Sequence, residues 1–320
     1  MRRSTLPAFG LLFLAATVAA CGPPGFEEQY EITKLRTLAI GAEPAALGPG
    51  EVVSFSALVV NPASPVPPTL KWEVCLLTDS PDNEYRCLSS PEFGDLGFEL
   101  GEGSSQQLPY DVFEQLDVDV EALCALFGSD EVPDFVSLPS CDEGLPVTIR
   151  LTAESEGDVE IAIREFLILD ETEAARDDRN TNPQMGDLLV NDVGLGSGEP
   201  VQVFQGGEEE FLELSLEVDL TTEAQSWEPV DPDNEGQRLA AEREVLRASW
   251  FSTLGEFEYA VTYYSEGITE DDELITNELR LPRRDPDAVG STVRVWVVLR
   301  DNRGGVSWKE WSFVYGGYVE

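Results

Sequence analysis

Apolar and polar residues alternate with a period of two along much of the first half of the chain. The clearest case is residues 51–60, where Val53, Phe55, Ala57 and Val59 lie on one face of an extended segment. This period predicts a half-buried β-strand, because successive side chains of a strand point to opposite faces of a sheet. The same pattern, bounded by breaks rich in proline and glycine, predicts further strands at 35–40, 70–77, 146–153 and 159–169.

The second half of the chain repeats this scheme. Residues 170–183, between the halves, are polar and lack an apolar period, which is typical of a linker between domains. Glycine-containing turns at 157–158 and 301–305 predict two hairpins. Strands are expected at 187–191, 201–204, 211–218, 245–251, 257–264, 293–300 and 306–315.

Short strands separated by turns about every ten residues are typical of β-sandwiches. We therefore expect a mostly β fold with two sandwich domains in tandem, at 32–169 and 184–320. A short helix is expected around 112–127, in the loop-rich part of the first domain. Residues 237–245 could also be helical, since Leu-Ala-Ala-Glu-Arg-Glu has good helix propensity, so the strand there is predicted only from Val245 onward.

The first twenty residues have the order of a secretory signal peptide. Arg2 and Arg3 are followed by the apolar stretch 6–20, which ends in Val-Ala-Ala before Cys21. The stretch is too short for a stable membrane-spanning helix. Small residues directly before a cysteine resemble a lipobox, and that resemblance implies cleavage before Cys21 and lipid on its thiol. The alternative is an ordinary signal peptide followed by an incidental cysteine.

Residues 21–31 then read as a lipidated end and a short tether, which would hold the first domain close to the membrane. Gly22, and not an aspartate, follows the cysteine. This resembles the best-known sorting rule for bacterial lipoproteins, and the resemblance implies the outer membrane. The expected location is the cell envelope, on a face that the sequence leaves open.

Charge narrows the classes of partner. The chain has 62 acidic and 20 basic residues, a formal charge of −42, and loss of Arg2 and Arg3 would leave −44. Nucleic acids and anionic lipid surfaces carry the same sign, so neither is an expected partner. The chain has no histidine, which excludes Ser-His-Asp and Cys-His nucleophiles and histidine metal ligands. No enzymatic activity is expected.

Four cysteines remain beside Cys21, and an even number in an exported chain suggests two disulfides. Three pairings are possible. Cys75–Cys87 and Cys124–Cys141 are favoured because both close short loops. A site with four thiolates around a metal is the alternative, but the paired C-x-x-C spacing of such sites is missing.

One segment matches part of a calcium-loop pattern. Asp231, Asp233, Glu235 and Glu242 would supply oxygen ligands, and Gly236 would permit the sharp turn. Calcium is the one cofactor that the sequence suggests. The alternative is an acidic surface loop between two strands, and in so acidic a chain such matches arise by chance.

Aromatic residues crowd the C-terminal hairpin. Trp308, Trp311 and Tyr315, with Trp296 and Tyr318 nearby, could form a surface that binds a sugar or a partner protein. Trp308 and Trp311 are an odd number of residues apart and therefore point to opposite faces of a strand, so at least one of them is expected in the core.

Three phrases carry a family resemblance: LAIGAEPAALGPGEVVSFSALV (38–59), SWFSTLGEFE (249–258) and VWVVLRDNRGGVSW (295–308). They resemble immunoglobulin-like domains in lipoproteins of Gram-negative bacteria. The resemblance implies that both sandwiches are immunoglobulin-like, with no known activity. One departure is that Cys75 lies on the strand of Trp72 itself, so its disulfide would close a loop and would not join the two sheets.

Two functions follow as hypotheses. The first is a non-enzymatic lipoprotein that acts as a binding or adhesion module at the cell surface. Its partners would be the membrane, through Cys21, and a protein or glycan. The second is a structural or accessory subunit of an envelope assembly that faces the periplasm.

Overall fold

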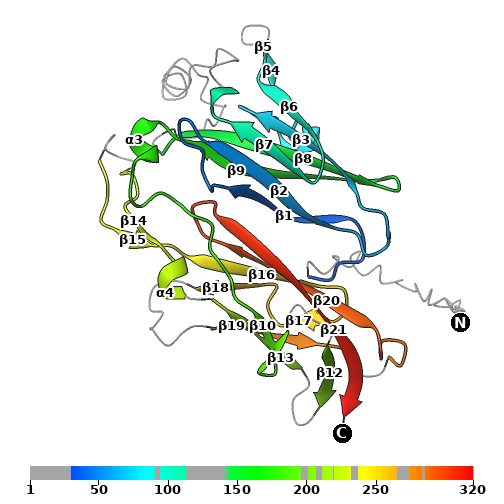
Figure 1. Ribbon diagram of the computed structural model, residues 1–320. Coiled ribbons are helices and arrows are strands. Elements are labelled where there is room, and N and C mark those ends of the chain that lie inside the picture. The colour runs from blue at the N-terminus through cyan, green and yellow to red at the C-terminus, as the bar shows by residue number, and fades with distance from the viewer. Residues whose placement is uncertain are drawn as a thin grey trace, which may run out of the picture.

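The computed structural model describes residues 30–90, 94–112, 141, 143–195, 201–206, 211–218, 220–231, 237–264, 274–282 and 285–319. Within these ranges the chain is mostly β, as predicted (Figure 1). The helical elements there are short: η1 (Pro81–Asn83), α3 (Glu171–Ala174) and α4 (Leu220–Glu223). None of the helices in the described ranges has the length and apolar character needed to cross a membrane. The helix expected around 112–127 lies outside the described residues, apart from its first residue.

The first sandwich has one sheet of three strands and one of four (Figure 1). Its first, second and fifth main strands form one sheet, and the other four form the second, which is an immunoglobulin-like arrangement. The hairpin turn is one residue earlier than predicted, at Glu156 and Gly157, and both residues have positive φ. The three-stranded sheet has the order β1 (Arg36–Glu43), β2 (Val52–Val60), β7 (Ser105–Pro109). The four-stranded sheet has the order β6 (Gly97–Glu102), β3 (Thr69–Cys75), β8 (Leu145–Ser155), β9 (Asp158–Ile168). A small ladder, β4 (Ser89–Ser90) and β5 (Gly94–Asp95), lies beside them.

The second sandwich has two sheets of five strands. Its first strand is divided between them, because β10 joins one sheet and β12 pairs in parallel with β21 in the other. This arrangement is also immunoglobulin-like. One sheet has the order β11 (Val193–Leu195), β10 (Leu188–Val190), β13 (Leu212–Glu217), β19 (Leu274–Arg280), β17 (Glu256–Phe257). The other has the order β12 (Val201–Gly206), β21 (Val306–Val319), β20 (Thr292–Arg300), β16 (Leu246–Ser252), β18 (Val261–Tyr264).

Residues 237–245 contain no helix, and the helical alternative for them is wrong. Glu242 and Arg243 form β15 (Glu242–Arg243), which pairs with β14 (Ser226–Trp227). The backbone hydrogen bonds of this segment go to the neighbouring strand of its hairpin, so helix propensity is overridden by pairing.

Each sandwich closes around a tryptophan in the same place. Trp72 on β3 and Trp250 on β16 are both buried, and each indole N–H has a partner: Trp72 donates to Gly103 O (2.8 Å) and Trp250 to Thr262 Oγ1 (3.0 Å). Phe55 packs against Trp72 with ring centroids 6.5 Å apart. Trp72 is therefore a packing residue of this core.

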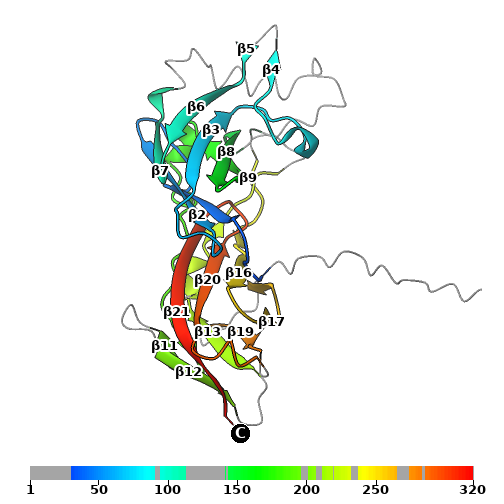
Figure 2. The ribbon, with the colours of Figure 1, turned by 90° about the vertical axis from the view of Figure 1, so that its right-hand side faces the viewer.

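A third apolar core joins the two sandwiches, which meet at a narrow waist (Figure 2). Leu38 and Ala39 of β1 meet Trp296 and Val298 of β20 there, and both strands are therefore covered on both faces. Gly41 allows the close approach, since a Cβ at this position would lie 2.6 Å from the ring of Trp308. The domains are thus packed together directly in addition to being connected by the chain.

Candidate functional site

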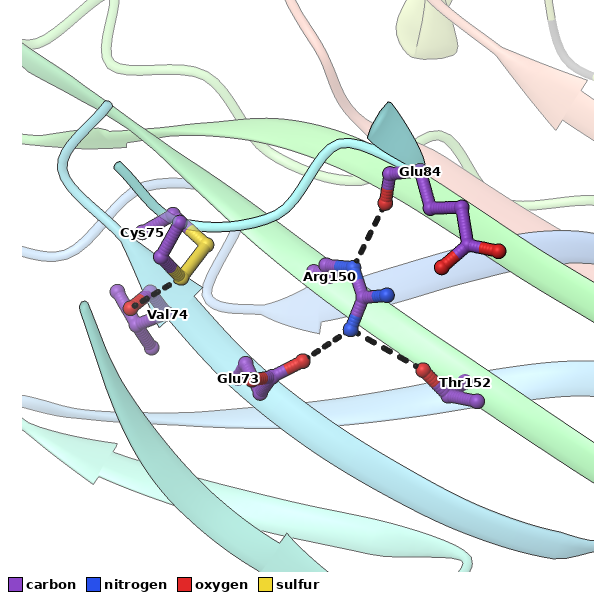
Figure 3. The surroundings of a disulfide bond; sticks show 7 residues. Glu73, Val74, Cys75, Glu84, Arg150 and Thr152 are labelled. Carbon is purple, nitrogen blue, oxygen red and sulfur yellow. Dashed lines mark hydrogen bonds and ion pairs between the residues drawn. A yellow bond between two sulfur atoms is a disulfide. The ribbon is translucent and has the colours of Figure 1, made fainter. Parts of the chain in front are cut away.

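The predicted disulfide Cys75–Cys87 is present, and it closes a loop without joining the two sheets. Figure 3 shows its surroundings. Arg150 on the adjacent strand donates from Nε to Glu84 O (3.0 Å) and pairs with Glu73. Glu84 has a positive φ of 59°, so this contact and the disulfide fix a loop with an uncommon backbone conformation.

The second predicted disulfide involves Cys124, which lies outside the described residues. Cys141 is disulfide-bonded. The pairing of Cys124 with Cys141 stays a prediction.

The predicted calcium loop is described only at its ends. Asp231 donates its backbone N–H to Gln237 O (2.9 Å), and Glu242 lies on β15 opposite Trp227. Asp233 and Glu235 lie outside the described residues. Among the residues that the structure describes, no group of three or more acidic or cysteine side chains is arranged to hold a metal ion. Calcium at this loop stays a prediction.

The aromatic surface expected at the C-terminal hairpin is not formed. Tyr315 is fully buried and Trp311 is 7% exposed, and both belong to the core of the second sandwich. Trp308 is half-buried against the shared core at the waist. Trp311 and Tyr315 are buried because they lie on the face of β21 that points into the second sandwich, and Trp308, on the opposite face, is partly covered by the first sandwich.

The waist holds the polar cluster that the sequence did not predict. In a chain with only 20 basic residues, several arginines from distant segments meet there. They lie on β9, on the segment after α3, before β15 and in the loop between β20 and β21: Arg164, Arg176, Arg179, Arg238 and Arg303. Apart from the low number of basic residues in the chain, no feature of the sequence marks these five arginines.

One arginine–carboxylate pair ties the expected linker to the first sandwich, and a second pair lies within the linker. Arg179 holds both carboxylate oxygens of Glu51, at 2.8 and 2.6 Å, and also bonds to Ala46 O. The hydrogen bonds from Arg179 lower the pKa of Glu51. Arg176 likewise donates hydrogen bonds to both carboxylate oxygens of Asp178, and these bonds lower the pKa of Asp178 to about 2. Residues 170–183 therefore form a packed connection, with the N-cap of α3 at Asp170.

The second sandwich contributes a buried pair of carboxylates. The Glu244 side chain is 0% exposed and accepts a hydrogen bond from Arg303 Nη1 (3.0 Å). Burial, and then the nearby Asp301, raise the pKa of Glu244 to about 7 despite that arginine. Asp301 accepts backbone N–H groups from Arg303 (2.8 Å) and Gly305 (2.7 Å), and burial raises its pKa.

A cavity of about 520 Å³ opens between the sandwiches at this point. Pro146 and Arg164 line it from the first sandwich, and Trp227, Val230 and Arg303 line it from the second. Sites for small molecules occur preferentially at domain interfaces and have volumes in this range.

Several buried polar atoms at the waist lack a hydrogen-bond partner among the described residues. They are Arg164 Nε, Asn180 Oδ1, Trp227 Nε1 and Asp301 Oδ2. Buried polar groups are nearly always paired with protein or with ordered water. Their concentration at one place distinguishes the waist from the interiors of the two sandwiches.

No family model matches the chain, and no curated protein matches it. Among solved structures it is similar to Escherichia coli alpha-2-macroglobulin activated by porcine elastase, with 12% identity and a TM-score of 0.23, over 92% of this chain and 23% of that chain. A chimeric titin Z1Z2 tandem gives 11% identity and a TM-score of 0.24, over 88% and 100%. A 1.5-MDa bacterial ice-binding adhesin gives 10% identity and a TM-score of 0.21, over 91% of this chain and 67% of that chain.

The chain thus spans less than a quarter of that macroglobulin's length. Likenesses this weak carry no argument about function. The immunoglobulin-like assignment rests on the strand order of the two sandwiches.

Proposed function

We propose that the chain is a non-enzymatic lipoprotein of the cell envelope that acts as a binding or adhesion module, with its two sandwiches working as one rigid unit. The observation that carries this proposal is the shared core at the waist, where Leu38 and Ala39 pack against Trp296 and Val298. A rigid pair of domains loses little conformational freedom when it binds a partner, so more of the contact energy remains as affinity.

The start of the described chain supports a particular mode of display. Tyr30 and Ile32 pair with Ser252 of the second sandwich through two backbone hydrogen bonds of 2.9 Å, and Tyr30 packs edge-on against Phe257 at 6.3 Å. The chain therefore enters at the waist, on the second sandwich, and not at the far end of the first. A lipid on Cys21 would be followed by a short tether that reaches at most about 30 Å when fully extended. Both sandwiches would then lie near the membrane, and the molecule would be held side-on.

Membrane fractionation tests the anchor. Replacing Cys21 by Ser is expected to move the protein from the membrane fraction to the soluble fraction, because the lipid would have no attachment site. An unchanged membrane fraction would contradict the anchor.

Protease treatment of intact and lysed cells tests the display. Removal of both sandwiches from intact cells, together with loss of cell binding to a glycan-coated or cell-coated surface in the Cys21→Ser strain, is the expected result. Cleavage only after lysis would contradict surface display and favour the periplasmic assembly subunit.

A further inference from the structure

We propose that the cavity between the two sandwiches binds a small organic carboxylate, with Arg164 as the charged contact and Trp227 as the apolar wall. This inference names a ligand class for the proposed binding module and rests on that role. Its test uses purified protein in solution, so it fails or succeeds independently of anchoring and surface display.

Arg164 lines the cavity with a positive charge that no carboxylate neutralises directly among the described residues. Its two terminal nitrogens donate to Ile40 O (2.8 Å) on the first sandwich and to Gly304 O on the second, while Nε lacks a partner among the described residues. No ion pair is recorded for it within the described ranges, whereas Arg303, on the opposite wall, is paired with Glu244. Burial lowers the pKa of Arg164 to about 10, so the side chain still carries its charge at neutral pH. A buried charge without a close counter-ion gains from an incoming anion.

A second buried arginine adds to the local positive potential. Arg300 donates to Leu38 O (2.7 Å) and to Ser249 Oγ (3.3 Å), with no carboxylate paired to it in the described residues. Burial and the charges of Arg247 and Arg164 lower the pKa of Arg300 to about 10. Asp301 lies close enough to act on Arg164 electrostatically, but no ion pair joins the two side chains among the described residues: its Oδ1 accepts two backbone N–H groups of its own loop, and its Oδ2 has no hydrogen-bond partner there.

The residues across the cavity from Arg164 indicate what the uncharged part of the ligand would be. The ring of Trp227 is covered on one face by the guanidinium of Arg303, at 4.8 Å, and Pro229 and Val230 follow it along the cavity. Together with Pro146 these residues offer an apolar surface beside the charge. A ligand with a flat or apolar body and one charged group fits this combination, since aromatic rings contribute contact area at little entropic cost.

The charges around the cavity favour a single negative charge on the ligand. Glu143 and Glu165 also line the cavity, in a protein with a formal charge of −42. A dianion such as phosphate would leave one charge unbalanced against these carboxylates, whereas a monocarboxylate matches Arg164 alone. The carboxylate of a peptide terminus and that of a sugar acid share this chemistry.

The test is a ligand-observed NMR titration of the full chain, purified in non-ionic detergent, with three probes. N-acetylphenylalanine represents a peptide terminus, galacturonate represents a sugar acid, and N-acetylphenylalanine amide is the neutral control. We expect one of the two acids to bind and the amide to bind about tenfold more weakly, because a charged hydrogen bond would be lost. Which acid binds more tightly identifies the source of the carboxylate. Equal binding of acid and amide, or no binding of either acid up to millimolar concentration, would overturn the proposal.

Matched variants assign the site. Arg164→Gln is expected to weaken the binding acid about tenfold, and Trp227→Leu to weaken both the acid and the amide. Arg164→Lys keeps the charge and is expected to retain part of the affinity, which separates loss of charge from loosening of the waist. The control is Lys71→Gln, which removes an exposed positive charge on the outer face of the first sandwich. An effect of Lys71→Gln as large as that of Arg164→Gln would show a general charge effect and would contradict the assignment.

Discussion

The two sandwiches are built on the same plan but are stabilised differently. Both place a buried tryptophan on the equivalent strand, Trp72 on β3 and Trp250 on β16, with the indole N–H paired. The first sandwich has the smaller sheets and a loop fixed by Cys75–Cys87, whereas the second has two sheets of five strands and no cysteine after position 141. The comparison suggests that a disulfide contributes to the stability of the first sandwich, whereas additional strands contribute to the stability of the second.

The tryptophans should show the largest effects and test whether the two interiors are equivalent. Trp72→Ala and Trp250→Ala are each expected to lower the free energy of unfolding by about 3–5 kcal/mol, because each leaves a large cavity in a close-packed core. Urea unfolding followed by circular dichroism measures both. A loss below about 1 kcal/mol for one of them, against the expected loss for the other, would break the equivalence.

Removing the disulfide should affect the first sandwich alone. The double variant Cys75→Ser and Cys87→Ser opens a link across a sequence separation of 12 residues, and we expect a loss of about 3 kcal/mol from the greater freedom of the unfolded chain. Hydrogen exchange should become faster in β3 and β6 and stay unchanged in β13 and β19. Faster exchange in β13 and β19 as well would contradict this division of roles.

The waist can be loosened at a single glycine. Gly41→Ala puts a Cβ 2.6 Å from the ring of Trp308, so the first sandwich must shift, and we expect a loss of about 1–3 kcal/mol. We expect this shift to appear in urea as separate unfolding transitions of the two sandwiches. The matched control is Gly194→Ala, whose Cβ would find its nearest neighbour, Leu189, at an ordinary 3.7 Å. Equal effects of the two variants would mean that the waist is not tightly packed.

Several strands found from sequence, such as β2 and β20, have only apolar side chains among their buried residues. Strand β19 was missed because Asn277 occupies a core position between Ile275 and Leu279 and breaks the apolar period. Its side chain is nevertheless satisfied: it donates to Tyr259 O (2.7 Å) and accepts from Tyr259 N (3.2 Å). A pattern of apolar positions cannot show that a polar residue is buried when its partner lies in a distant segment, here between β17 and β18.

The waist was beyond sequence reasoning for a related reason. Arg164 and Gly304 meet only after the two domains have folded and packed, and Arg179 and Glu51 lie far apart in the sequence, so no local period marks such contacts. The run of apolar residues in β20 did carry a hint. Trp296 and Val298 are apolar on the face that an isolated sandwich would expose to solvent, and they are buried by the first sandwich. The same coverage partly buries Trp308, whereas Trp311 and Tyr315 belong to the core of the second sandwich itself.

The smallest effect expected is a pH dependence that belongs to the waist and to neither interior. Because the pKa of Glu244 is about 7 in the folded protein and near 4.5 in the unfolded chain, the folded state binds more protons between these values. Stability from this group is therefore full below about pH 4.5 and is lost as the pH rises through about 7. Between pH 5 and pH 6 the free energy of unfolding should fall by about 1 kcal/mol on its account. The lowered pKa values of Asp178 and Glu51 act at lower pH, outside this window.

Glu244→Gln should abolish that fall, since the amide does not titrate and still presents an oxygen to Arg303. Urea unfolding of the variant and of the unchanged protein at pH 5 and pH 6 gives the difference directly. Glu242→Gln, on the exposed strand β15 of the neighbouring hairpin, is the control and should leave the fall in place. If the fall persists in Glu244→Gln, the buried carboxylate is not the titrating group. The pH dependence would then come from another group, and Asp301, whose pKa burial also raises, would be the next one to test.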